Sequence, residues 1–194
     1  MVALLAMLAC NGPAPPDPAD YAESIVAARA AKDEAFREAP DSPVPANRRD
    51  ALLPLSYFPV DQAYNVPAVL QRPTRPEPSI EMPTSTGLRR EMMRVGRLEF
   101  NLKGEPLGLS AFVETNGPGT ERLFVPFTDI TTGAETYPGG RYLDLDRTAT
   151  GIYELDFNVA YHPYCYFDSR FDCPYPPLEN RLGVPVRAGE RLPE

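Results

Sequence analysis

Proline is the residue that most constrains how this chain can fold, because it accounts for 24 of 194 positions. Proline fixes φ and has no N–H to donate, so it is excluded from helix interiors and from central strands. We therefore expect short strands joined by rigid loops. The hydrophobic share of 43% and the charged share of 24% are typical of one folded domain at this length.

The charge of the chain excludes one class of partner. The formal net charge is −8, and the sequence contains no basic stretch of the kind that binds phosphates. We expect no nucleic-acid partner.

The first ten residues, "MVALLAMLAC", are an apolar run that ends in Leu8-Ala9-Cys10, and the Pro-rich segment "NGPAPPDPAD" follows. This order is typical of a bacterial lipoprotein signal, in which the cysteine becomes the acylated N-terminus. The run is too short to span a bilayer. It also lacks a preceding Lys or Arg and has Met7 where Leu is usual, which leaves open a start further upstream or an ordinary hydrophobic N-terminus. We expect residues 1–10 to be signal and anchor, residues 11–19 a tether, and residues 20–194 one domain.

Localisation follows from that interpretation. Acylation of Cys10 would make the membrane a partner and would place an exported, lipid-anchored protein in the bacterial cell envelope.

One helix is predicted, over "DYAESIVAARAAKDEAFREA" from Asp20 to about Ala39. Asp20 and Glu23 have the spacing of a capping box. The apolar side is narrow, so the helix should lie across the surface of the domain. That side consists of Tyr21, Ile25, Ala28 and Phe36, and the charges from Arg29 to Arg37 are interpreted as a solvated face.

Beyond Leu52 the hydrophobic period changes to two, which is typical of strands. Residues 97–102 and 107–113 alternate around "KGEP" and predict a hairpin. Further strands are predicted at 122–127, where Pro126 indicates an edge or bulged strand, and at 141–146, 152–160 and 182–188. The predicted fold is mainly β: an antiparallel sandwich or barrel-like sheet with one N-terminal helix.

Two polar segments interrupt the strand pattern. In the first, Gly139 and Gly140 precede Arg141. The guanidinium of Arg141 would either bind a ligand carboxylate through two hydrogen bonds or pair with an acid of the protein and staple the loop. In the second, Asp156 and Asn158 point away from an apolar strand face formed by Tyr153, Leu155, Phe157 and Val159. Their face is either exposed to solvent or forms the wall of a polar pocket beneath the Arg141 loop.

Four runs together resemble a known family: "LSYFPVDQAYNVPA", "FVPFTDITTGAETYPGGRYLDL", "LDFNVAYHPYCYF" and "CPYPPLENRLGVPVRAGE". They are similar to the bacterial domain-of-unknown-function family 1684, over roughly residues 20–192, in its short, lipoprotein-like form. The family implies no activity. The resemblance implies a shared polar set of Asp129, Thr131, Glu135, Tyr137, Gly139, Gly140, Arg141, Asp156, Asn158, Tyr161, Cys165, Cys173, Glu179 and Asn180. His162 stands where the family pattern usually has Asn.

Cys165 and Cys173 allow three interpretations. A metal site would need His162 with both thiols and an acid such as Asp168 or Asp172, but only one pair is close in sequence and relatives carry Asn. A Cys165 nucleophile with His162 as its base meets the same objection; Asp156 or Glu179 as the base is the alternative. We prefer a disulfide, which would contribute roughly 2–3 kcal/mol in an oxidising compartment. We expect no metal and no cofactor.

Three functions remain open, and the sequence does not decide whether the protein is an enzyme. The preferred hypothesis is a non-catalytic envelope lipoprotein that binds a small polar ligand or an envelope protein. The second is a hydrolase that uses paired carboxylates from Asp129, Glu135, Asp156 and Glu179, and the third is a purely structural domain. The binding candidates are Asp129, Thr131, Glu135, Tyr137, Arg141, Asp156, Asn158, Tyr161, Glu179 and Asn180.

Overall fold

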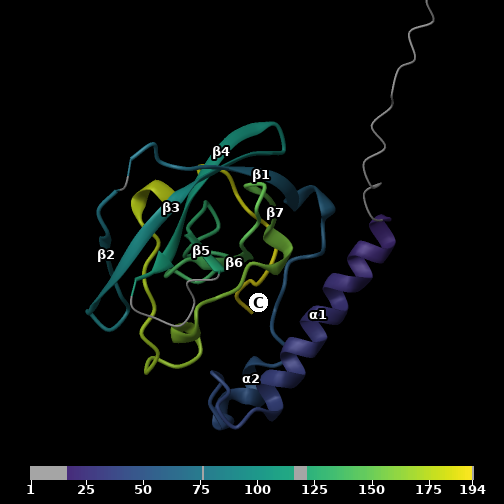
Figure 1. The fold of residues 1–194 in the computed structure, drawn as a ribbon. Helices are drawn as coiled ribbons and strands as arrows, with labels where there is room; N and C mark the ends of the chain where they lie inside the picture. The colour runs from purple at the N-terminus through teal and green to yellow at the C-terminus, as the bar shows by residue number, and fades with distance from the viewer. Residues whose placement is uncertain (1–16, 76, 116–121, 194) are drawn as a thin grey trace, which may run out of the picture.

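The computed structural model describes residues 17–75, 77–115 and 122–193, and its main element is one antiparallel sheet (Figure 1). The strand order is β6-β5-β4-β3-β1-β7, with β2 paired to β3. Because β6 and β7 are consecutive in the chain yet lie at the two ends of this order, the sheet curls into a nearly closed barrel. The strands are β1 Asn65–Gln71, β2 Ile80–Pro83, β3 Arg89–Leu102, β4 Glu105–Glu114, β5 Arg122–Phe127, β6 Arg141–Asp146 and β7 Ile152–Asp156.

The helices lie outside the barrel. The long helix α1 (Pro18–Glu38) runs beside it and the short α2 (Arg49–Leu52) lies below (Figure 1). The described residues also form five 3-10 turns: η1 Ala46–Arg48, η2 Gln62–Tyr64, η3 Phe157–Val159, η4 Tyr164–Tyr166 and η5 Leu178–Asn180. Within the described part of the chain, no helix combines the length and apolar character needed to cross a membrane.

Helix α1 begins earlier than its sequence pattern predicts. Asp17 caps the helix by accepting a hydrogen bond from the N–H of Ala19 at 2.8 Å, and Pro18 occupies the first turn. Proline is favoured there because its missing N–H has no helical partner anyway. The predicted Asp20–Glu23 capping box is therefore wrong. Helix α1 also takes over the last two residues of the predicted tether; residues 11–16 of the tether and the predicted signal lie outside the described residues.

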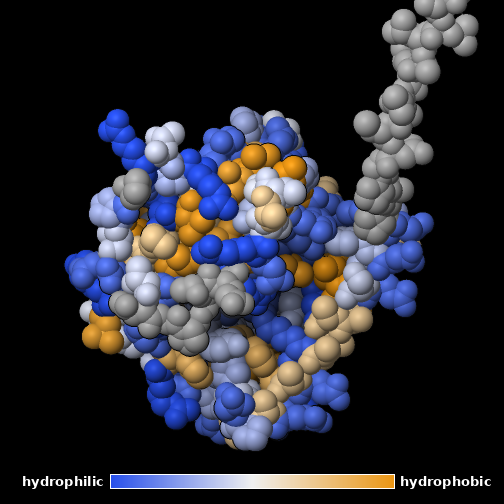
Figure 2. All heavy atoms as spheres, in the orientation of Figure 1, coloured by the Kyte–Doolittle hydropathy of each residue, from blue (hydrophilic) through white to orange (hydrophobic). Residues whose placement is uncertain are grey.

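The inner side of α1 is more polar than predicted. Tyr21, Ile25 and Phe36 are buried as expected, but Asp33 is buried with them. Its carboxylate accepts a hydrogen bond from the N–H of Leu55 at 2.9 Å. The interpretation of these charges as a solvated face is thus wrong in part. Figure 2 shows mildly hydrophobic side chains along α1 between hydrophilic ones.

The main core fills the barrel. Alternate residues of every long strand point inward, for example Leu98 and Phe100 from β3 and Leu143 and Leu145 from β6. Each large apolar side chain buried in this way contributes about 1.5–3 kcal/mol. A smaller cluster of Met82, Met92 and Phe112 lies on the outer face of the sheet. The predicted hairpin is confirmed as β3–β4, and its strands are longer than expected.

Three strand predictions differ from the structure. Strand β5 lies between β4 and β6 rather than at an edge. Residues 182–188 form no strand and run as irregular chain along the end of the barrel. Strand β7 ends at Asp156, where η3 begins, so Val159 is exposed instead of sharing the buried face.

Asn180 of η5 explains why a proline is tolerated in β5. Its side-chain amide donates to the carbonyls of Pro126 and Ser110 at 2.7 and 2.9 Å, and it accepts from the N–H of Ser110 at 2.7 Å. The amide therefore fills the gap between β4 and β5 where Pro126 has no N–H to offer.

Candidate functional site

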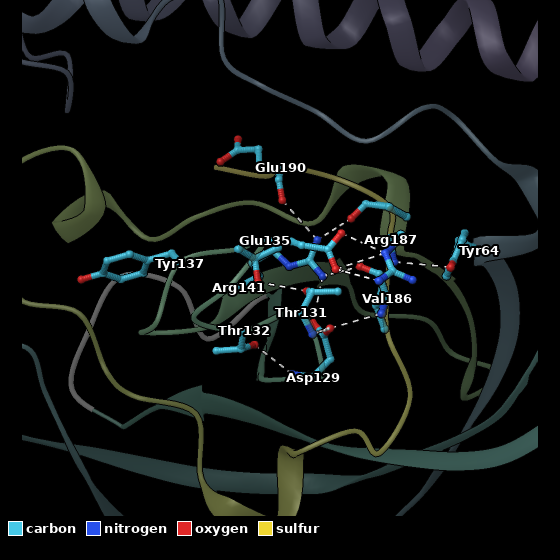
Figure 3. A network of polar contacts seen from close by, with 12 residues as sticks. Tyr64, Asp129, Thr131, Thr132, Glu135, Tyr137, Arg141, Val186, Arg187 and Glu190 are labelled. Atoms are coloured by element: carbon cyan, nitrogen blue, oxygen red, sulfur yellow. Dashed lines mark hydrogen bonds and ion pairs between the residues drawn. The ribbon is translucent and has the colours of Figure 1, made fainter. Parts of the chain in front are cut away.

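Arg141, at the start of β6, is the centre of a buried polar network at one end of the barrel (Figure 3). Its side chain is fully buried and lies 2.9 Å from the carboxylate of Asp129. It also donates to the carbonyl oxygens of Val186 at 2.6 Å, of Glu190 at 3.2 Å and of Ala188. Burial lowers the pKa of Arg141, and the neighbouring Asp129 opposes that effect.

The rest of the network explains the polar residues that precede Arg141. Asp129 accepts hydrogen bonds from the N–H groups of Thr131 and Val186 at 2.7 and 3.2 Å. Gly140 has φ +86, and a Cβ there would lie 2.6 Å from the carbonyl of Phe127. The network ties the C-terminal segment to the barrel, as the stapling alternative predicts, and Arg141 is not available to a ligand.

Tyr137 points away from Arg141, whereas the carboxylate of Glu135 is directed at Arg187 (Figure 3). Glu135 forms a bidentate pair with the half-exposed Arg187, at 2.8 and 2.9 Å, and these hydrogen bonds lower the pKa of Glu135. Tyr137 packs its ring against Tyr166 and directs its hydroxyl at Sγ of Cys165, 3.9 Å away.

Asp156 and Asn158 hold α1 against the barrel, and Asn158 also holds the chain just before η2. The amide of Asn158 donates to the carbonyl of Asp61 at 2.9 Å and to the hydroxyl of Tyr21 at 2.9 Å. The same hydroxyl donates to Asp156 at 2.8 Å. The expectation of one pocket lined by Arg141, Asp156 and Asn158 is therefore wrong, because both sets of side chains are already bonded to the protein.

The four carboxylates of the hydrolase hypothesis are held by four different partners. Asp129 pairs with Arg141 and Glu135 with Arg187, whereas Glu179 lies 3.1 Å from Arg94 and Asp156 binds Tyr21. An acid–base couple needs two carboxyl groups that converge on a shared cleft. The arrangement does not support paired-carboxylate catalysis.

His162 is buried, and its ring packs near the rings of Tyr137 and Tyr166. Its Nε2 accepts a hydrogen bond from the N–H of Tyr137 at 3.3 Å, and Nδ1 is 3.7 Å from the Glu190 carboxylate. Lys32 Nζ lies 2.6 Å from this carboxylate and offsets its charge. Burial dominates and lowers the pKa of His162 to about 3. No group of three metal-binding side chains occurs in the described ranges, so the alternative metal site of His162, Cys165 and Cys173 is wrong.

Cys165 and Cys173 are adjacent but unlinked in the structure. Both are free thiols, so the predicted disulfide is not seen, yet the N–H of Cys165 donates to Sγ of Cys173 at 3.1 Å. Cys10 lies outside the described residues.

A cavity of about 390 Å³ lies on the outer face of β3 to β6, beneath residues 161–174. Its aromatic lining consists of Phe124, Tyr142, Tyr161, Tyr164 and Phe171. Its charged lining consists of Arg90, Glu114, Arg122, Asp144 and Asp172, and Met92 and Cys173 also contribute.

The positive charge of Arg90 in this cavity is paired within the protein, and the carboxylate of Asp144 is bonded to a tyrosine hydroxyl. Arg90 is 3.1 Å from Asp172 and 3.6 Å from Glu114, so its positive charge is matched within the protein. Asp144 accepts a hydrogen bond from the hydroxyl of Tyr161 at 2.7 Å. Burial first, and then the charge of Asp144, raise the pKa of Tyr161, which keeps the phenol protonated.

Of the residues lining this cavity, the sequence predicted only Tyr161 as a ligand-binding candidate. The missed signal is an alternation on the outward face of the strands, where an aromatic residue is followed two positions later by an acid: Phe112 and Glu114 on β4, and Tyr142 and Asp144 on β6. Register aligns these positions, since Phe124 pairs with both Phe112 and Asp144. Strand pairing is not visible from one sequence.

Comparison with known proteins gives a family and a fold. The family model described as "Protein of unknown function (DUF1684)" matches residues 51–191. A solution NMR structure of an uncharacterized protein from Haloarcula marismortui is similar, at 39% identity and a TM-score of 0.69, over 90% of this chain and 95% of that one. No curated protein matches the chain.

Proposed function

The chain belongs to the DUF1684 family of proteins of unknown function, and from that premise we propose that it binds a small organic cation in the cavity beneath residues 161–174. The observation that carries the proposal is the carboxylate of Asp144 among aromatic rings in this cavity. Aromatic faces attract ammonium groups, and an adjacent carboxylate adds to that attraction.

The remaining charges of the cavity favour a cation over an anion. Arg90 is matched by Asp172 and Glu114, and Arg122 lies at the more exposed rim, 2.9 Å from Asp146. The chain also carries a net charge of −8, which raises the local concentration of cations. Tyr164, with 43% of its surface exposed, supports an open mouth through which a ligand enters.

The size of the cavity supports a small molecule as the ligand rather than an envelope protein. About 390 Å³ falls within the range of roughly 300–1,000 Å³ that is typical of small-molecule pockets. Its walls carry more apolar than polar surface, so the ligand should combine an apolar body with one charged end.

A matched pair of probes tests the proposal. Choline and its uncharged isostere 3,3-dimethylbutanol have nearly the same shape and differ in charge. Titration followed by NMR should show about five- to thirtyfold tighter binding of choline, because a cation–π contact contributes about 1–2 kcal/mol.

Two variants refine this test. Asp144→Asn should remove most of the preference for choline, whereas Glu135→Gln, which changes the Arg187 pair away from the cavity, should keep it. Equal binding of both probes, no binding of either, or an unchanged preference in Asp144→Asn would refute the proposal.

The proposal includes a lipid anchor and export to the bacterial cell envelope. Its support is the apolar run that ends at Cys10, followed by a Pro-rich spacer. Metabolic labelling with an alkyne fatty acid tests it: the label should appear on the wild-type chain and be lost in Cys10→Ser, which should also leave the membrane fraction. An unlabelled wild-type chain in the soluble fraction would contradict the anchor.

A further inference from the structure

We propose that Cys165 and Cys173 form a redox-active dithiol, in which Cys165 attacks a small disulfide and Cys173 resolves the mixed disulfide. This chemistry is independent of cation binding in the neighbouring cavity. It rests on the geometry of two thiols: Cys173 also contributes to the cavity wall, but neither thiol takes part in the proposed cation binding.

The two sulfurs have different surroundings. Cys165 lies in η4, is partly exposed, and has the hydroxyl of Tyr137 directed at its sulfur at 3.9 Å. Cys173 has only 6% of its surface exposed. An incoming disulfide can therefore reach Cys165 more readily than Cys173.

The contacts between the residues favour a thiolate on Cys165. A hydrogen bond from the Cys173 thiol is the largest effect and lowers the pKa of Cys165 to about 6, with further contributions from Ser85 and Tyr137. The same hydrogen bond, together with burial, raises the pKa of Cys173. Attack in thiol–disulfide exchange requires the thiolate, so the two cysteines are suited to different steps.

The backbone holds the pair in place. The N–H of Cys165 donates to Sγ of Cys173 at 3.1 Å, and the N–H of Cys173 donates to the hydroxyl of Ser85 at 3.1 Å. Tyr142 fixes the following residue by donating to the carbonyl of Pro174 at 2.5 Å. The resolving sulfur is thus anchored against the sheet, beside the residue that would carry the mixed disulfide.

The exchange balances without a further reactant. The Cys165 thiolate attacks one sulfur of a low-molecular-weight disulfide RSSR, forms Cys165–S–S–R and expels RS⁻. Cys173 then loses its proton, attacks the Cys165 sulfur and expels the second RS⁻. The protein dithiol loses two electrons and two protons, and RSSR becomes two RSH.

Oxidised glutathione is the probe that tests this inference. Wild-type protein should lose the mass of two hydrogen atoms, with peptide mapping placing the bond between Cys165 and Cys173, and reduced glutathione should restore the dithiol. Cys173→Ser should trap a glutathione adduct on Cys165, and Cys165→Ser should form no adduct at Cys173. Circular dichroism checks that both variants fold.

A second measurement covers a variant that fails to fold. In the wild-type chain at pH 7, iodoacetamide should alkylate Cys165 at least about tenfold faster than Cys173, because only the former is a thiolate. In Tyr137→Phe this advantage should shrink. Equal alkylation rates, an adduct at Cys173 in Cys165→Ser, or a disulfide that glutathione cannot reduce would each overturn the inference.

Discussion

Replacing Arg141 with Met should destabilise the protein far more than removing any exposed arginine. The substitution leaves the Asp129 carboxylate buried without its partner, and it leaves the carbonyls of Val186, Ala188 and Glu190 without their donor. Breaking a buried pair by removing one member costs about 3–5 kcal/mol. Since a domain is stable by about 5–15 kcal/mol, this loss is a large share of the total.

The matched control is Arg187→Met. Arg187 also pairs with a carboxylate, Glu135, but its side chain is 55% exposed, whereas the Arg141 side chain is fully buried. An exposed pair contributes about 0–1 kcal/mol. Urea unfolding of the two variants, followed by circular dichroism, should therefore show a difference of about 2–5 kcal/mol.

The result that refutes this reasoning is specific. If Arg141→Met loses no more stability than Arg187→Met, the buried network is not the staple that holds the C-terminal segment. If Arg141→Met does not fold, Arg141→Lys serves instead: it keeps the charge but loses the fork that reaches several acceptors, so it should fold with an intermediate loss of stability.

Three further predictions follow from buried polar groups. The pKa of His162 is lowered to about 3 in the folded protein, below the unfolded value near 6.5. The unfolded state therefore binds the proton first, and the free energy of unfolding falls as the pH drops below about 6.5. Between pH 7 and pH 5, the wild type should lose about 2 kcal/mol more stability than His162→Asn does. Asn180→Leu should cost about 3 kcal/mol in urea unfolding, because the backbone groups of Ser110 and the carbonyl of Pro126 lose their partner. Tyr21→Phe should cost about 1–3 kcal/mol and speed hydrogen exchange in α1, since the hydroxyl binds the charged Asp156. An unchanged pH dependence, an Asn180→Leu variant of wild-type stability, or unchanged exchange in α1 would each refute the corresponding prediction.

The sequence predicted those parts of the fold whose signal is local. Two-residue alternation around a tight turn identified the β3–β4 hairpin, because both strands bury one face against the same core. The mainly antiparallel β architecture and the single long helix were also confirmed. The predicted strand at 182–188 failed because its carbonyls bind Arg141, a partner some 40 or more positions away in the sequence, instead of a neighbouring strand.

The candidate site was less predictable because its polar residues look alike in sequence whether they bind ligands or staple loops. Arg141 followed two glycines, which suited either role, and its burial decided for the staple. Asp156 and Asn158 were expected on a strand face, but η3 turns the chain and directs both at Tyr21. The cavity walls, in contrast, come from four strands whose pairing sets which aromatic residue lies beside which acid.

The most direct measurement of the central claim is a crystal structure of the protein soaked with choline. The account predicts a cation bound beneath residues 161–174, with its ammonium group near Asp144 and Tyr164, and an unchanged Arg141 network. Choline bound at the Arg141 end of the barrel, or an outer cavity that remains empty at saturating choline, would contradict it.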